Sequence, residues 1–176
     1  MTKPLFWCAF ICSAALLSSA CQKAPASGGV FPMGERVPVG QVTYSVVDSA
    51  WKTKLGESFK ARSPEQRFLL LTISIVNGTG HDISIPLLTL EGPDGQTYRE
   101  LSNGDGVDNW LGLLRTISPG QTEQGRVLFD VPLTSYRLRV PDVADPGLEK
   151  YVKVDIPLRL DSEVPIQSPI APESLK

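Results

Sequence analysis

The chain has 176 residues and a formal net charge of −2, with fifteen glycines and fifteen prolines. This length suits one domain of ordinary size. Proteins that bind nucleic acid usually carry an excess of basic residues on one face, and the nearly balanced charge argues against that class. The many glycines and prolines, with β-branched and aromatic residues between them, are typical of a β-rich chain with many turns.

The first twenty residues have the features of an export signal. Lys3 provides a short positive segment, and an apolar run follows from residue 4 to residue 17. This run is shorter than the roughly 20 residues that a helix needs to span a bilayer, and it fits the apolar region of a signal peptide. Small residues at 18–20 then lead directly to Cys21. We therefore predict that residues 1–20 are a signal peptide that is removed on export.

Cys21 and the residues before it resemble the lipobox of bacterial lipoproteins. In that motif diacylglycerol is attached to the cysteine thiol, and cleavage makes the cysteine the first residue. Ser18 stands where the motif usually has a branched apolar residue, and Leu17 lies one position earlier. The lipobox predicts a palmitate-type anchor in the cell envelope, at the outer membrane or on the outer face of the cytoplasmic membrane. Two alternatives remain: a secretory signal that leaves a free thiol, and an uncleaved anchor helix.

Composition divides the rest of the chain into three parts. Residues 21–35 are predicted to be the anchored cysteine and a flexible tether, because small residues predominate there and no apolar periodicity is present. The folded domain is expected from residue 36 to residue 160. The proline-rich tail, residues 161–176, is expected to be extended or disordered. No cysteine follows Cys21, so the domain has to fold without a disulfide.

Alternation of apolar and polar residues predicts about seven strands in this domain. The longest apolar run, residues 67–76, is expected to be a central strand, and Asn77-Gly78-Thr79-Gly80 marks a turn directly after it. Pro157 indicates that the final strand lies at a sheet edge, because proline cannot donate to the ladder. The other predicted strands centre on residues 42–46, 83–85, 88–90, 127–131, 136–140 and 152–160. The fold class is therefore all-β, an antiparallel β-sandwich.

Several segments resemble a known family when they are taken in order. Residues 40–46 resemble its opening strand, 68–77 the characteristic strand that ends in Asn, 94–98 its hairpin, and 119–132 its late strand. Together they resemble the immunoglobulin-like domain-of-unknown-function family 4352, which occurs on secreted bacterial proteins and lipoproteins. The resemblance covers about residues 36–142 and implies an immunoglobulin-like sandwich. The family has no established enzymatic activity, so the resemblance implies no catalytic residues.

Residues suited to catalysis are scarce. His81 is the only histidine and follows a glycine-rich turn, which indicates a surface position. One histidine cannot form the multi-histidine sites that zinc and copper enzymes use. No nucleophile motif accompanies it, as a Ser-His-Asp arrangement would require. We expect that the protein is not an enzyme and that it needs no cofactor.

The turn at residues 103–109 contains oxygen ligands at close spacing. Asn103, Asp105 and Asp108 offer oxygens of the kind that calcium prefers, and Asp142 could add a carboxylate from another loop. Val107, however, stands where an EF-hand loop would place another oxygen ligand. A solvated turn is the preferred interpretation, and a calcium site is the alternative.

The segment from residue 101 to residue 117 is expected to be loop-rich and carries large apolar residues. Trp110, Leu111, Leu113 and Leu114 form a candidate contact surface, since aromatic residues are enriched at binding hot spots. The alternative is that they cover an open end of the sandwich. We therefore expect a non-catalytic, membrane-anchored accessory module that binds an unidentified envelope protein. A structural envelope component without a specific partner, and a ligand-binding domain, remain as alternatives.

Overall fold

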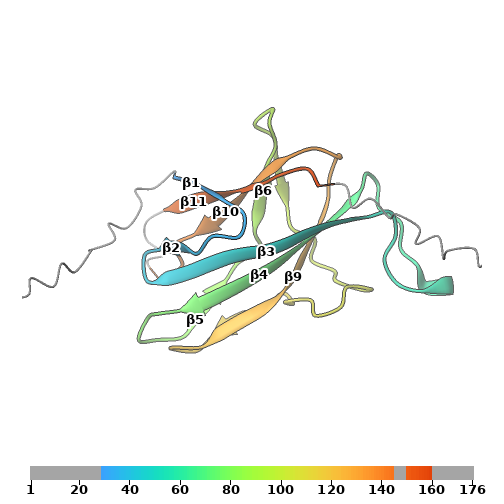
Figure 1. Cartoon of the computed structure of the whole chain (residues 1–176). Coiled ribbons are helices and arrows are strands. Elements are labelled where there is room, and N and C mark those ends of the chain that lie inside the picture. Colours follow the sequence, from blue (N-terminus) through green and yellow to red (C-terminus); the bar gives the residue numbers. More distant parts are fainter. Residues whose placement is uncertain (1–28, 145–149, 160–176) are drawn as a thin grey trace, which may run out of the picture.

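The computed structural model describes residues 29–144 and 150–159, and these form a β-sandwich (Figure 1). Within these ranges there are eleven strands and one short 3₁₀ turn, η1 (Ser58–Lys60), and no α-helix. The predicted signal peptide, Cys21 and the predicted tail lie outside the described residues. No helix in the described ranges is long and apolar enough to cross a membrane. The predicted all-β sandwich is confirmed.

The strands form two main sheets and one short ribbon. The five-stranded sheet has the order β1-β11-β10-β6-β7, the four-stranded sheet has the order β2-β3-β4-β9, and β5 pairs with β8. Neighbouring strands are antiparallel except for β1 and β11, which are parallel. The bounds are β1 (Val30–Pro32), β2 (Val37–Val39), β3 (Val42–Lys52), β4 (Phe68–Asn77), β5 (Ile83–Ile85), β6 (Thr89–Glu91), β7 (Thr97–Arg99), β8 (Arg115–Ile117), β9 (Thr122–Asp130), β10 (Tyr136–Pro141) and β11 (Tyr151–Ile156).

The main core lies between the two sheets and follows the alternation along the strands. In β4, Leu69, Leu71, Ile73 and Ile75 belong to this core and are at most 1% exposed. They pack with residues of the opposite sheet such as Leu138, which is fully buried. Burying a side chain of this size contributes about 1.5–3 kcal/mol. The prediction of a central strand is confirmed, because β4 lies between β3 and β9.

A second buried cluster lies on the other face of β4. Phe68 and Leu70 alternate with the core residues of that strand, yet they are only 2% and 6% exposed. The β3–β4 connection supplies Leu55 to this cluster, and the β7–β8 connection supplies Leu101 and Val107. These two long connections are therefore packed parts of the fold, and they cover the outer face of the four-stranded sheet around Phe68 and Leu70.

The N-terminal boundary differs from the expectation. Residues 30–35 were assigned to the predicted tether, but β1 pairs with β11, and the Lys153 amide donates to the Gly29 carbonyl at 2.8 Å. The fold therefore begins before residue 36. Short strands show little alternation, and the three-residue strands β1, β2 and β8 have no counterpart among the predicted strands. The same reason explains why about seven strands were expected.

The prediction that Pro157 marks an edge strand is wrong. β11 lies between β1 and β10, so both of its sides are paired. Pro157 follows directly after Ile156 and ends the strand, instead of lying within a longer strand that reaches residue 160. The proline is thus tolerated because it stands outside the ladder.

The turn predicted after β4 is confirmed and is organised by a buried amide. Asn77 is fully buried, and its Nδ2 donates to the carbonyls of His81 and Ile117, both at 2.8 Å. Its Oδ1 accepts the amide and hydroxyl hydrogens of Thr79 at 2.8 Å and 2.7 Å. One side chain thus fixes the turn and joins it to β8.

Candidate functional site

The β7–β8 connection is closed at its base by a buried ion pair. Glu100 and Arg115 stand at its two ends, and their side chains are 0% and 1% exposed. Arg115 Nη1 donates to Glu100 Oε2 at 3.0 Å, and Nη2 donates to Oε1. Arg115 Nε also donates to the Gly112 carbonyl at 2.7 Å, while Glu100 Oε2 accepts the Leu88 amide hydrogen at 2.9 Å. The pair therefore holds the loop closed and joins it to the segment before β6.

The environment of Glu100 opposes its charge, and its partners support it. Burial raises the pKa of Glu100, while the hydrogen bonds from Arg115 and from the Leu88 amide act in the opposite direction. A buried pair of this kind contributes little net stability, but removing one partner leaves an uncompensated charge. The pair is thus a structural requirement of the loop.

Two of the four predicted contact residues are used to close the sandwich. Leu111 belongs to the main core and is 9% exposed, and its amide donates to the Arg126 carbonyl at 3.0 Å. Trp110 is half-buried and forms a parallel bridge with Arg126 of β9. Gly104 lies so close to the indole that a Cβ at that position would overlap it. The alternative placed these residues at an open end of the sandwich, whereas the structure places Trp110 along β9, the edge strand of the four-stranded sheet.

The other two predicted contact residues face solvent. Leu113 is 48% exposed and Leu114 is 96% exposed. Arg115 pairs with Ile85 at the start of the β5–β8 ladder, so Leu114 lies one residue outside it. Sequence reasoning did not single out a further exposed apolar residue, Phe59, which lies on η1 in the β3–β4 connection. No periodic pattern surrounds Phe59, so the sequence carried no signal for it.

The turn predicted as an alternative calcium site is engaged in other contacts. Asn103 Oδ1 accepts the Asp105 amide hydrogen at 2.8 Å, and both terminal nitrogens of Arg62 donate to the Asn103 carbonyl at 3.1 Å. This guanidinium would repel a bound cation. Asp105 and Asp108 are exposed, and the Asp142 carboxylate lies against the turn before β3. The turn at residues 103–109 contacts Arg62 in the connection after β3, whereas Asp142 lies at the turn before β3. β3 has 11 residues and spans roughly 36 Å, so the two turns lie at opposite ends of this strand.

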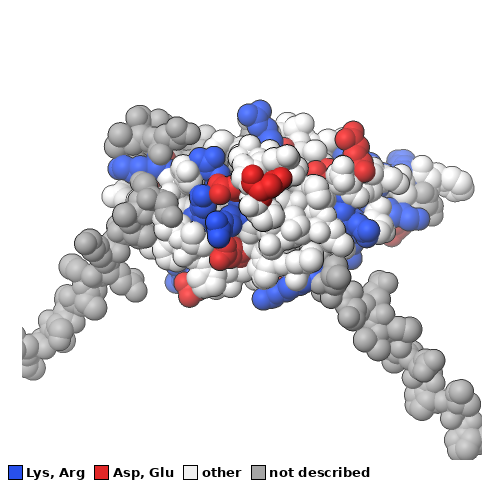
Figure 2. Space-filling model, turned by 90° about the horizontal axis from the view of Figure 1, so that it is seen from above, with Lys and Arg blue, Asp and Glu red and all other residues white. Residues whose placement is uncertain are grey.

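His81 lies in an exposed turn, as the sequence predicts, and its backbone carbonyl accepts hydrogen bonds from Asn77 and Thr79. In the described part of the chain, no three or more His, Cys, Asp or Glu side chains gather in a group that could hold a metal ion. The five-stranded sheet carries the exposed ion pair Arg137–Asp155 and the half-buried ion pair Lys153–Glu91. Figure 2 shows basic and acidic side chains intermixed on the side of the molecule seen from above.

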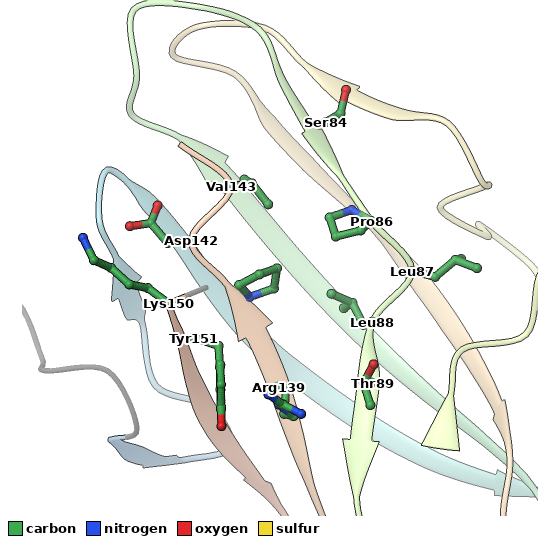
Figure 3. Close-up of a pocket in the computed structure, with 11 residues that line it drawn as sticks. Ser84, Pro86, Leu87, Leu88, Thr89, Arg139, Asp142, Val143, Lys150 and Tyr151 are labelled. Atoms are coloured by element: carbon green, nitrogen blue, oxygen red, sulfur yellow. The ribbon is translucent and has the colours of Figure 1, made fainter. Parts of the chain in front are cut away.

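A groove opens where β10 and the segment before β6 separate (Figure 3). The two strands pair only as far as Arg139 and Thr89. Beyond that point the chain is directed away from β10, because the Leu88 amide binds Glu100 and β5 pairs with β8. The resulting groove has a volume of about 480 Å³. Its position depends on the ion pair that closes the β7–β8 connection.

The groove combines apolar walls with charged residues. Arg139 lies over the Tyr151 ring, with its guanidinium carbon 3.8 Å from the ring centroid. Asp142, which is 8% exposed, accepts the Ala144 amide hydrogen at 3.2 Å. Behind it, the Tyr44 hydroxyl donates to the Pro141 carbonyl at 2.9 Å. Burial, and secondly the charge of Asp142, raise the pKa of Tyr44.

Comparisons with solved structures support the sandwich fold. The yjhA protein from Bacillus subtilis is 16% identical, with a TM-score of 0.54 and coverage of 71% of this chain and 99% of that chain. MPT63, a secreted protein from Mycobacterium tuberculosis, is 20% identical, with a TM-score of 0.53 and coverage of 74% and 99%. A candidate lipoprotein from Bacillus subtilis, ycdA, is 17% identical, with a TM-score of 0.53 and coverage of 70% and 38%.

These identities establish similarity of fold alone, and no protein of curated function matches the chain significantly. The family comparison is more specific. Residues 31–146 match the family described as Domain of unknown function (DUF4352), in agreement with the resemblance found in the sequence. Because this match covers more than half of the sequence, the chain belongs to the DUF4352 family.

Proposed function

We propose that the protein is a lipid-anchored, non-catalytic accessory module of the bacterial cell envelope that binds another envelope protein. The exposed pair Leu113–Leu114 carries this proposal. A leucine that is 96% exposed, on a loop whose base is fixed by a buried ion pair, presents apolar surface to a partner at low entropic cost. Burying such a side chain contributes about 1.5–3 kcal/mol.

The proposed location of the module in the cell envelope rests on the sequence and on similarity of fold. Cys21 follows an apolar segment and small residues, as in lipoprotein signals. One protein of similar fold, ycdA from Bacillus subtilis, is described as a candidate lipoprotein. An anchor of two or more acyl chains gives stable membrane attachment, since each buried CH₂ contributes about 0.8 kcal/mol. Such an anchor would then hold the module at the membrane.

The test is photo-crosslinking in living cells that produce the full-length protein, with a photoreactive amino acid at position 113. One dominant crosslinked protein is expected, and it should be lost in Leu114→Asp. Leu133→Asp is the matched control, because Leu133 is also exposed, at 42%, but lies between β9 and β10. Cys21→Ser, which removes the acceptor of the lipid, should also abolish the crosslink.

Two results would contradict the proposal. If Leu114→Asp and Leu133→Asp reduced capture equally, the exposed leucines would not be the contact. If only diffuse neighbours were captured at good efficiency, the alternative of a structural envelope component without a specific partner would be favoured.

A further inference from the structure

The groove beside β10 has the size and the walls of a small-molecule site. Its volume of about 480 Å³ falls within the range of roughly 300–1,000 Å³ that is typical of such sites. Pro86 and Leu87 line one side, and Pro141 and Val143 line the other. The two prolines have no N–H to donate, and the Pro141 carbonyl already accepts the Tyr44 hydroxyl. These residues give the groove apolar surface, and Figure 3 shows polar and charged residues such as Ser84, Thr89 and Arg139 beside them.

Arg139 is the charged group at one end of this groove. Its guanidinium is stacked on Tyr151, and no carboxylate of the described residues lies within ion-pair distance of it. Two other cations of the same sheet are paired: Arg137 with Asp155 at 3.2 Å, and Lys153 with Glu91 at 2.8 Å. Arg139 acts on Glu91 only at longer range, and the aromatic ring holds its guanidinium in place.

Asp142 is the carboxylate among the described residues that line the groove. The Asp142 carboxylate already has partners within the protein. Its Oδ1 accepts the Ala144 amide hydrogen, and both of its oxygens lie close to Gly40 in the turn between β2 and β3. The guanidinium of Arg139 therefore favours an anion over a cation at this end of the groove.

We propose that this groove binds a small organic anion with an apolar body, and that Arg139 holds the anionic group. The guanidinium forms paired hydrogen bonds with carboxylate, sulfonate or phosphate oxygens. Because Arg139 is held by stacking, little rotamer freedom is lost when a ligand binds. The apolar body lies against Pro86, Leu87 and Val143. This site is independent of the protein contact proposed above.

The experiment compares two dyes that share an apolar body. 8-Anilinonaphthalene-1-sulfonate carries a sulfonate, and N-phenyl-1-naphthylamine lacks it. Binding is followed by dye fluorescence, using the chain from residue 21 with Cys21→Ser, which keeps every described residue. The sulfonate dye should bind saturably at one site. Arg139→Gln should weaken it roughly tenfold or more, since a charge-assisted hydrogen bond contributes about 1.5–3 kcal/mol.

Matched variants make the result specific. Arg137 lies two residues from Arg139 on β10 and does not line this groove. Arg137→Gln should therefore change the affinity for the sulfonate dye by less than about twofold. The neutral dye should bind equally well to the original chain and to Arg139→Gln. Leu87→Asp places a carboxylate in the groove, keeps Arg139 on Tyr151, and should weaken both dyes. Far-UV circular dichroism checks that each variant is folded.

Several outcomes would overturn the proposal. It fails if the sulfonate dye does not bind at one saturable site, or if Arg139→Gln and Arg137→Gln weaken it equally. It also fails if Arg139→Gln weakens the neutral dye as much as the sulfonate dye, because the guanidinium charge would then have no role. If the Arg139→Gln variant does not fold, the Leu87→Asp variant provides the test. Unchanged binding of the sulfonate dye to Leu87→Asp would refute the site.

Discussion

Replacing Arg115 by Met tests the role of the buried ion pair. The change removes two charge-assisted hydrogen bonds to Glu100 and one bond to the Gly112 carbonyl. It leaves a carboxylate that is 0% exposed with only the Leu88 amide as partner. An uncompensated buried charge costs about 3–5 kcal/mol. Glu100→Gln should cost a similar amount, because it leaves the guanidinium buried without an opposite charge.

The double variant separates this effect from a loss of packing. Glu100→Gln with Arg115→Met contains no buried charge, and the Gln oxygen can still accept the Leu88 amide hydrogen. We expect it to lose only about 1–2 kcal/mol, so that the two changes are strongly non-additive, with a coupling energy of at least about 4 kcal/mol in magnitude. The exposed pair Arg137–Asp155, whose side chains are 52% and 54% exposed, provides the control. Arg137→Gln should cost less than about 0.5 kcal/mol.

Urea unfolding of the chain from residue 21 with Cys21→Ser, followed by far-UV circular dichroism, measures these values. With a slope of about 2 kcal/mol per molar urea, each single change should lower the midpoint by roughly 2 M. A loss below about 1 kcal/mol in Arg115→Met, or additive effects in the double variant, would refute the reasoning. Either result would mean that the base of the β7–β8 connection is solvated in solution.

Three further predictions concern other parts of the fold. Gly104→Ala should displace the Trp110 indole, which would overlap the new Cβ, and shift the tryptophan emission to longer wavelength; an unchanged spectrum would contradict the packing. Asn77→Ala should lower the free energy of unfolding by about 2–4 kcal/mol, measured in urea, because the Ile117 carbonyl and a buried amide lose their partner. Burial, together with Tyr98 and Asp94, raises the pKa of Tyr136 from 10.0 to about 12. The raised pKa stabilises the fold below pH 10, and this contribution is lost as the pH rises toward 12, so Tyr136→Phe should show a weaker decline in stability there.

The long strands could be predicted because their alternation is a local property. In β4, every second residue from Leu69 to Ile75 enters the main core, and this regularity is visible in the sequence. The turn after β4 was equally clear, because Asn and Gly have specific turn conformations. β1 and β2 escaped detection because three residues give no periodicity, and β1 is defined only by its pairing with a strand about 120 residues later.

The candidate site was only partly predictable. Trp110, Leu111, Leu113 and Leu114 were grouped by composition, but the pairing of Trp110 with Arg126 decides which of them are covered. That pairing depends on the register of β9, which local sequence does not reveal.

The ion pair and the groove have the same origin. Glu100 and Arg115 read in the sequence as ordinary surface charges, and only the folded chain brings them together in the interior. Arg139 resembles its neighbour Arg137 in the strand pattern, yet one lies over Tyr151 and the other is bound to Asp155. Their different roles follow from cross-strand partners that were not known in advance.

The parallel pairing of β1 with β11 has a mechanical consequence. A pulling force applied through the chain before Gly29 acts along β1, so it loads the hydrogen bonds to β11 in shear and all at once. If β1 yielded, residues 30–36 would extend the chain by roughly 20 Å. The core would lose the contacts of Phe31 and Met33, but its buried residues begin at Val37, which belongs to the opposite sheet. The N-terminal strand can therefore act as a force-limiting extension that lengthens before the domain unfolds.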